Sequence, residues 1–359
     1  MQDHPPTKSN SQIALLLPLS GRLSDAGETI RDGFLAAYYG LNESVRPSIR
    51  VYDAAADVAP VFHKAIDDGA TFIVGPLGKE QVASIRALVD GKVPVLALNH
   101  LADAETAPKS FYQLALAPED DARQIAARAL ELDQKTAAVL VPSGEWGQRV
   151  RQAFAAAFTA GGGHIATAET YPIDTTDFSD VLTPLLGFEE SQKRYRTVSG
   201  LVGGNLIFTP RRRDDLDFVF FAGQPVHARL VRPQLKFHFA GDLPLYATSD
   251  VHDPRATSNQ DLEGIAFVDI PWLISDSDGI NRLRETVAQL WPGDARHGGR
   301  LFALGHDAAT LAIRLKNGEP IDALSGLTGS LTLDPNGRFR RALQWATFAA
   351  DGSTHTLVR

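Results

Sequence analysis

Ile13-Ala-Leu-Leu-Leu-Pro-Leu-Ser-Gly21 is followed at once by an amphipathic segment over residues 23–39. The first stretch is an apolar run of strand length that ends in a Ser-Gly turn. In the second, apolar residues recur at three- and four-residue spacing, which predicts a helix with one buried face. Asp25 and Glu28 resemble a capping box and predict where that helix begins. The chain therefore opens with a strand–turn–helix unit.

Similar units continue through the first third of the chain. Strands are expected at residues 48–53, 71–75, 93–98 and 111–116. Helical patterns lie between and after them, at residues 58–68, 80–89 and 119–132. This alternation predicts an α/β fold in which a parallel sheet is covered by helices on both faces.

The pattern then restarts. Strands are expected at residues 136–141, 165–171, 218–222 and 245–248, with helices at 146–160 and 225–235. The tail adds a helix at 300–315 and two strands, 329–333 and 342–349, joined by the hairpin turn Asp334-Pro335-Asn336-Gly337.

Two successive strand–helix series predict two similar lobes, each with a parallel sheet. We expect lobe 1 at residues 12–117 plus 273–329 and lobe 2 at 118–272 plus 330–359, after a polar linker at 1–11. The chain would then cross between lobes near residues 117, 272 and 329. Trp272, beside a proline at the second crossing, is expected to be a buried packing residue rather than an exposed partner anchor.

The composition excludes several classes of protein. Acidic residues outnumber basic ones by 43 to 35, so broad attraction to nucleic acid or to anionic lipid is not expected. The chain has no cysteine, which excludes disulfides, thiolate metal sites and cysteine nucleophiles. No apolar stretch has the length of a membrane-spanning helix. Residues 1–11 lack a signal-peptide core, so we expect a fragment of a longer protein whose targeting signal lies upstream.

The common catalytic motifs are absent. No Gly-x-Gly-x-x-Gly follows a strand, and Gly75-Pro-Leu-Gly-Lys79 has too few residues between its glycines for a phosphate loop. No His-Glu-x-x-His metal motif and no Gly-x-Ser-x-Gly elbow occur. We therefore expect no catalytic residue, no metal site and no cofactor.

Candidate ligand-binding residues follow the expected strands, because ligands of open α/β sheets bind beyond the carboxyl ends of the strands. In lobe 1 and lobe 2 they are Ser20, Gly21, Gly75, Asn99, Ser143, Glu145, Trp146, Tyr171, Gln224, Thr248, Ser249 and Asp250. For an amino-acid ligand, Ser20, Asn99 and Thr248 would bind the carboxylate. Glu145 or Asp250 would bind the amine.

Residues 188–215 are polar and charged and predict a solvated loop. Arg211, Arg212 and Arg213 could bind phosphate, but the aspartates beside them favour a local ion-pair cluster. The same arginines are the candidate partner-binding surface.

Several segments together resemble the LppC/LpoA lipoprotein family and the type I periplasmic-binding-protein fold. They include Leu15-Leu-Leu-Pro-Leu-Ser-Gly21, Val74-Gly-Pro-Leu77, Val95-Leu-Ala-Leu-Asn99, Ala117-Pro-Glu-Asp-Asp-Ala122, Pro210-Arg-Arg-Arg-Asp-Asp-Leu-Asp217, the long run over residues 229–250, Asp269-Ile-Pro-Trp272 and Gly326-Leu-Thr-Gly-Ser-Leu331. The resemblance covers nearly everything from Ile13 to the C-terminus.

This resemblance implies the C-terminal domain of an outer-membrane lipoprotein that faces the periplasm. It further implies a non-catalytic regulator whose partner is a class A (bifunctional) penicillin-binding protein, a peptidoglycan synthase. The alternative is a periplasmic solute receptor that binds an amino acid or a cell-wall fragment.

Overall fold

The computed structural model describes residues 12–102, 105–202, 211–256, 259–292 and 295–357. The chain divides into two compact units. Unit 1 comprises the chain up to Leu116 together with Ile270–Ala342. Unit 2 comprises Ala117–Asp269 and Leu343–Arg359. The linker expected at residues 1–11 lies outside the described residues.

Unit 1 contains a five-stranded parallel sheet in the order β2-β1-β3-β4-β5. Its strands are β1 (Gln12–Leu17), β2 (Ser48–Asp53), β3 (Ala70–Val74), β4 (Val95–Ala97) and β5 (Phe111–Gln113). The opening apolar run forms an interior strand of this sheet, since β1 pairs with both β2 and β3. Residues 13–17 are almost completely buried, as expected for a strand covered on both faces.

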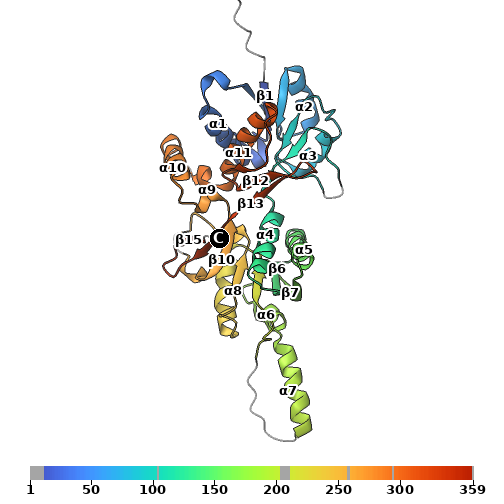
Figure 1. The fold of residues 1–359 in the computed structure, drawn as a ribbon, viewed down its shortest axis with the longest axis vertical. Coiled ribbons are helices and arrows are strands. Elements are labelled where there is room, and N and C mark those ends of the chain that lie inside the picture. Colours follow the sequence, from blue (N-terminus) through green and yellow to red (C-terminus); the bar gives the residue numbers. More distant parts are fainter. Residues whose placement is uncertain (1–11, 103–104, 203–210, 257–258, 293–294, 358–359) are drawn as a thin grey trace, which may run out of the picture. The chain divides into compact units, whose positions relative to one another are not determined.

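Helices cover both faces of this sheet (Figure 1). One face is covered by α1 (Ser24–Tyr39) and α11 (Arg300–Lys316), and the other by α2 (Val58–Asp67) and α3 (Lys79–Arg86). Two further helices of this unit, α9 (Pro271–Ile274) and α10 (Asp278–Leu290), precede α11 in the chain. Helices α1 and α11 cross at Gly33 and Gly305. A Cβ atom at either glycine would overlap a backbone carbonyl of the other helix, so only glycine permits this close approach.

Helix α1 does not begin with the expected capping box. It follows a 3-10 turn, η1 (Gly21–Leu23), and its N-cap residue Leu23 makes no side-chain hydrogen bond. Asp25 therefore lies inside the first helical turn, where its carboxylate is 3.4 Å from the Arg296 guanidinium.

A small antiparallel sheet completes unit 1, with β11 (Leu324–Ser325), β12 (Ser330–Leu333) and β13 (Phe339–Ala342). The predicted turn at residues 334–337 joins β12 to β13, not to a strand at 342–349. Because β12 and β13 pair with each other and β12 pairs with β11, residues 330–342 stay in unit 1. We expected them in lobe 2, so the last passage between the units comes two strands later than the sequence indicated, after β13 instead of before β12.

The loop between β11 and β12 is fixed by one buried carboxylate. Asp307 of α11 is 1% exposed and accepts three hydrogen bonds from this loop. The donors are the Leu327 and Thr328 backbone N–H groups, at 2.8 and 2.7 Å, and the Thr328 hydroxyl, at 2.6 Å. The loop also accepts a hydrogen bond at the Leu327 carbonyl from the backbone N–H of Trp272.

Trp272 is buried, as predicted, with 2% of its surface exposed. Its ring stacks on Phe302 with centroids 5.4 Å apart. The Arg284 guanidinium lies 5.8 Å from the Trp272 ring centroid and donates hydrogen bonds to the Trp272 and Ser275 carbonyls. Arg284 thus closes the C-terminal end of α9, where carbonyl groups lack helical partners.

Unit 2 contains a mixed seven-stranded sheet in the order β15-β14-β10-β9-β8-β6-β7. The strands are β6 (Thr136–Pro142), β7 (His164–Tyr171), β8 (Phe218–Phe221), β9 (Leu245–Ala247), β10 (Ile265–Asp269), β14 (Gln344–Phe348) and β15 (Thr354–Leu357). Five of them are parallel, but β14 and β15 are antiparallel additions at one edge. A wholly parallel sheet was therefore the wrong expectation for this unit.

The helices of unit 2 are α4 (Pro118–Glu131), α5 (Glu145–Ala160), α6 (Ser179–Leu185), α7 (Phe188–Val202) and α8 (Pro225–Phe237). Helix α5 packs its phenylalanines on strand β8: Phe154 stacks on Phe220 with centroids 4.1 Å apart, and Phe158 meets Phe218 edge-on at 5.6 Å. These rings are buried and form an aromatic core on this side of the sheet.

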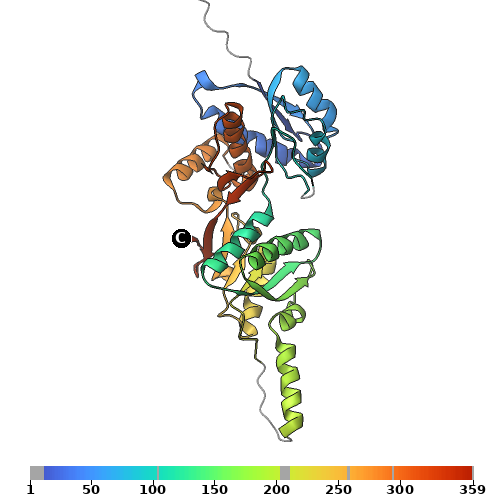
Figure 2. The same cartoon turned by 45° about the vertical axis from the view of Figure 1, so that its right-hand side comes forward.

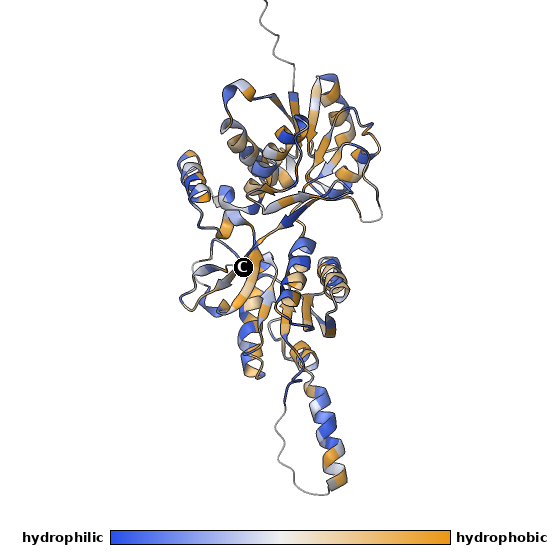
Figure 3. Ribbon diagram, in the orientation of Figure 1, coloured by the Kyte–Doolittle hydropathy of each residue, from blue (hydrophilic) through white to orange (hydrophobic). Residues whose placement is uncertain are grey.

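Helix α7 occupies part of the stretch expected to be a loop. Within unit 2 it extends away from the sheet in both Figure 1 and Figure 2. Most of its residues are hydrophilic (Figure 3), and Val198 and Leu201 near its end are 48% and 82% exposed. A loop was expected because few residues of this stretch are suited to packing on a core. The segment is nevertheless rich in Glu, Gln, Lys and Arg, which have high helix propensity and support a solvated helix.

Candidate functional site

The first group of candidate residues lies at the carboxyl edge of the unit 1 sheet. Backbone hydrogen bonds join the loops that follow neighbouring strands: Ala54 N–H donates to the Leu17 carbonyl, and Leu98 N–H donates to the Pro76 carbonyl. The structure therefore brings Ser20, Gly21, Gly75 and Asn99 to one edge, as the strand pattern predicted.

Asp53, at the end of β2, organises the loop that carries Ser20. Its carboxylate accepts hydrogen bonds from the Leu19 and Ala55 backbone N–H groups, at 2.9 and 3.0 Å. The pKa of Asp53 is held below its ordinary value, first by the Ser20 hydroxyl and then by those N–H groups, because hydrogen bonds to the carboxylate favour its charged form. Sequence reasoning missed Asp53, although its position at the end of a strand was a usable signal.

Gly75 and Asn99 are engaged within the protein. Gly75 has φ +101°, and a Cβ atom there would overlap the Leu16 carbonyl oxygen, so the residue serves close packing of β3 on β1. The Asn99 amide donates to the Leu77 carbonyl at 3.1 Å, and its side-chain oxygen accepts from the His100 N–H at 2.9 Å. Gly21 has φ +70° and is exposed.

The second group lies at the carboxyl edge of the parallel strands in unit 2. Neighbouring loops are again joined by backbone hydrogen bonds: Ser143 N–H donates to the Tyr171 carbonyl at 2.8 Å, and Thr248 N–H donates to the Phe221 carbonyl at 3.2 Å. Ser143, Glu145, Trp146, Gln224, Ser249 and Asp250 all have exposed or half-buried side chains at this edge.

Tyr171 and Thr248 belong to the core instead. Both are 0% exposed. The Tyr171 hydroxyl donates to the Ala222 carbonyl at 2.8 Å, and burial, with a smaller contribution from Asp250, raises the pKa of this hydroxyl above its ordinary value. Their assignment as ligand-binding side chains is corrected, because packing has removed both side chains from solvent and has engaged the Tyr171 hydroxyl.

Asp121 is a further residue at this edge that the sequence analysis did not single out. It lies in the first turn of α4, is 1% exposed, and accepts a hydrogen bond from the Ser249 backbone N–H at 2.9 Å. Three consecutive acidic residues at a helix start, Glu119 to Asp121, were the available signal.

These contacts disfavour a carboxylate clamp. Of the three side chains expected to bind an amino-acid carboxylate, Asn99 bonds to neighbouring backbone and Thr248 is buried. The third, Ser20, interacts with the Asp53 carboxylate, whose negative charge repels an anion.

The triple arginine is largely an ion-pair cluster. Arg212 lies 2.6 Å from Asp242 and also donates to the Phe239 carbonyl. Arg213 binds Asp215 through two hydrogen bonds of 2.7 and 2.8 Å. Arg211 is exposed and makes no ion pair with any residue that the structure describes.

Neither a metal-binding cluster nor a membrane-spanning helix occurs among the residues that the structure describes. No group of three or more His, Cys, Asp or Glu side chains is arranged to hold a metal ion. None of the helices placed in the structure has the length and apolarity that crossing a membrane requires.

Comparison with known proteins identifies relatives of the whole chain. The sequence profile described as LppC lipoprotein matches residues 6–351. The penicillin-binding protein activator LpoA of Photobacterium profundum is 28% identical over 95% of this chain, and that of Vibrio antiquarius is 30% identical over 94%. The chain spans just over half of each relative, 56% and 57% respectively.

Solved structures give the same grouping. The C-domain of LpoA (YraM) from Haemophilus influenzae, described as a regulator of PBP1A, has 26% identity and a TM-score of 0.73, with 97% of this chain and all of that chain covered. Full-length LpoA from that organism also gives 0.73, with 59% of its chain covered. An ABC transporter substrate-binding protein from Sphaerobacter thermophilus, 18% identical over 97% of this chain and 96% of its own, shares the fold at 0.67. The predicted two-lobed, binding-protein-like α/β fold is confirmed.

Proposed function

Because this chain belongs to the LppC lipoprotein family, we propose that it is the regulatory domain of a penicillin-binding protein activator. The single observation that carries the proposal is the match to the regulator's C-domain over the full length of that domain. The chain would bind a class A penicillin-binding protein and stimulate peptidoglycan synthesis without catalysing a reaction itself. Its parent would be a lipoprotein anchored in the outer membrane and exposed to the periplasm.

The geometry supports a binding rather than a catalytic role. At the two sheet edges three polar side chains bond to backbone: Asp53 to its own loop, Asn99 to Leu77, and Asp121 to Ser249. Such groups shape loops and do not form a nucleophile with an adjacent base. The engagement of Asn99 and the burial of Thr248 argue against the amino-acid receptor alternative, because both side chains were expected to bind the carboxylate of the ligand.

The test is a crosslinking assay with a purified class A penicillin-binding protein and lipid II, with and without this chain. We expect more peptide crosslinks at saturating chain, with binding measured in parallel by surface plasmon resonance. A thermal-shift screen of amino acids and muropeptides checks the alternative. A stabilising ligand, together with no effect on the synthase, would replace the regulator assignment by that of a receptor.

The triple arginine stays within the proposal as part of the partner surface. Arg212 and Arg213 are held in place by Asp242 and Asp215, so Arg211 is the side chain best placed to contact a partner. Replacing Arg211 alone with serine tests this. The control is Arg212→Ser, which removes the same charge from a side chain that is held by Asp242. Weaker synthase binding with Arg211→Ser and an unchanged melting temperature would support the assignment.

A further inference from the structure

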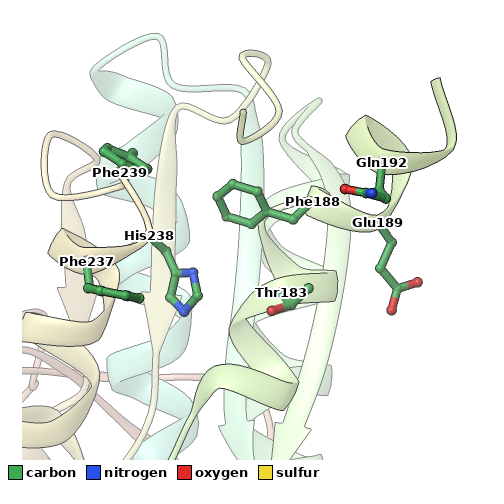
Figure 4. A pocket seen from close by; sticks show the side chains of 7 residues that line it. All are labelled: Thr183, Phe188, Glu189, Gln192, Phe237, His238 and Phe239. Carbon is green, nitrogen blue, oxygen red and sulfur yellow. The ribbon is translucent and has the colours of Figure 1, made fainter. Parts of the chain in front are cut away.

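An aromatic groove lies between the start of α7 and the end of α8 in unit 2. Its volume is about 470 Å³, and its aromatic lining consists of Phe188, Phe237, His238 and Phe239. Figure 4 shows the Phe188 ring pointing toward the side of the groove that carries the other three rings. The centroid of His238 is 5.6 Å from that of Phe188 and 5.4 Å from that of Phe237. Thr183, Glu189 and Gln192 supply the polar lining.

Two of these rings are exposed to an extent that folding alone does not explain. Phe237 is 78% exposed and Phe239 is 73% exposed. Phe239 also has φ +54°, immediately beyond the end of α8, where the Ala240 N–H returns to the Leu235 carbonyl. Glycine is the favoured residue for this left-handed helix ending, and a bulky side chain there is strained. A large apolar ring at this position therefore opposes stability twice, by strain and by exposure.

The groove also has a defined charge. Nearby cations are neutralised: Lys193 binds Glu190 at 2.8 Å, and Arg212 binds Asp242 at 2.6 Å. Glu189, which lines the groove, forms no ion pair with any residue in the described part of the chain. Three phenylalanine rings and one carboxylate in the same lining are suited to a cation, which ring quadrupoles attract.

We infer that this groove binds an arginine side chain of the protein partner. Arginine is preferred because its planar guanidinium stacks on aromatic faces, is weakly hydrated, and can donate to Glu189. The inference rests on the proposed function for the identity of the partner, a class A penicillin-binding protein, but the groove's preference for a guanidinium does not depend on it.

The first experiment tests the groove without the synthase. The probes are acetyl-Ala-Arg-Ala amide and the same peptide with citrulline, which has nearly the same shape and no charge. In 1H–15N spectra of the 359-residue chain we expect the arginine peptide to shift the amide signals of residues 188–192 and 237–239. The citrulline peptide should leave them unchanged, and Glu189→Gln should remove the response. Equal shifts with both peptides, or none with either, would overturn the inference.

The second experiment uses the synthase and three variants. Phe239→Gly should keep or raise the melting temperature, because it relieves the strained helix ending, yet weaken synthase binding about tenfold. Glu189→Lys should weaken binding at least as much, whereas Glu190→Lys, one position away, is the matched control for charge.

The two proposals fail in different ways. If the unmodified chain neither binds nor stimulates the synthase, the proposed function is wrong, while the peptide titration still decides the groove's ligand. If the unmodified chain stimulates the synthase and both Phe239→Gly and Glu189→Lys do so equally well, the groove is not the docking site. A loss with Phe239→Gly alone would indicate an apolar occupant and would contradict the arginine assignment.

Discussion

Replacing Trp272 with alanine is expected to destabilise unit 1 strongly. The indole is 2% exposed, stacks on Phe302 and lies beneath the Arg284 guanidinium. Truncation of such a residue removes its buried apolar area and leaves a cavity, which costs about 3–5 kcal/mol. The aromatic pair accounts for about 0.5–1.5 kcal/mol beyond the buried area, which favours the upper half of that range.

The size of this effect can be checked against two further variants. Trp272→Phe retains a ring against Phe302. The indole N–H makes no hydrogen bond within the described residues, so its removal leaves no new unpaired acceptor there. We therefore expect a smaller loss of about 1–2 kcal/mol. Trp146→Ala is the matched control in unit 2, since Trp146 is only half-buried.

The assay is urea unfolding followed by far-ultraviolet circular dichroism, because the substitution removes a fluorophore. In thermal unfolding a loss of about 3–5 kcal/mol corresponds to roughly 6–20 °C, at about 2–4 °C per kcal/mol for a unit of this size. A loss for Trp272→Ala below about 1 kcal/mol, which is typical of surface substitutions, would refute the packing role derived for this residue.

Three further predictions follow from single contacts. Gly75→Ala should destabilise unit 1 by more than about 2 kcal/mol in urea unfolding, because the new methyl group would overlap the Leu16 carbonyl and the residue has positive φ; an unchanged urea midpoint would contradict this. Asp307→Ala should cost about 2–4 kcal/mol, because it leaves the buried donors of the Leu327–Thr328 loop unpaired; Asp307→Asn should recover part of the loss, and equal values for the two variants would rule out the hydrogen-bonding role. For Asp53 the folded pKa is lowered, so its stabilisation is present above the ordinary aspartate pKa of about 4 and is lost as pH falls through the lower folded value. The difference in unfolding free energy between the parent and Asp53→Asn should therefore shrink below about pH 4. A difference that does not depend on pH would disprove the linkage.

The local periodicity of apolar residues was sufficient to predict the alternating strands and helices. Residues 13–17 are continuously apolar because they lie in a strand buried on both faces, and the apolar stripe over residues 23–39 follows the buried face of α1. The strand ends could likewise be located, since a parallel sheet places all its carboxyl ends at one edge. The family resemblance lay in the same local segments.

Only the tertiary structure decided which residues at those edges are accessible. Tyr171 has the sequence context of a ligand-facing aromatic, but its burial depends on packing against Phe178 and on the Ala222 carbonyl, which is 51 residues away. The position of the last passage between units likewise depends on the pairing of β12 with β13. The positive φ of Phe239 could not be predicted from the residue type, because glycine is the residue that usually adopts it. Sequence determined the elements because their spacing is a property of each segment alone. Tertiary structure decided the site because exposure and hydrogen bonding depend on partners that are distant in the chain.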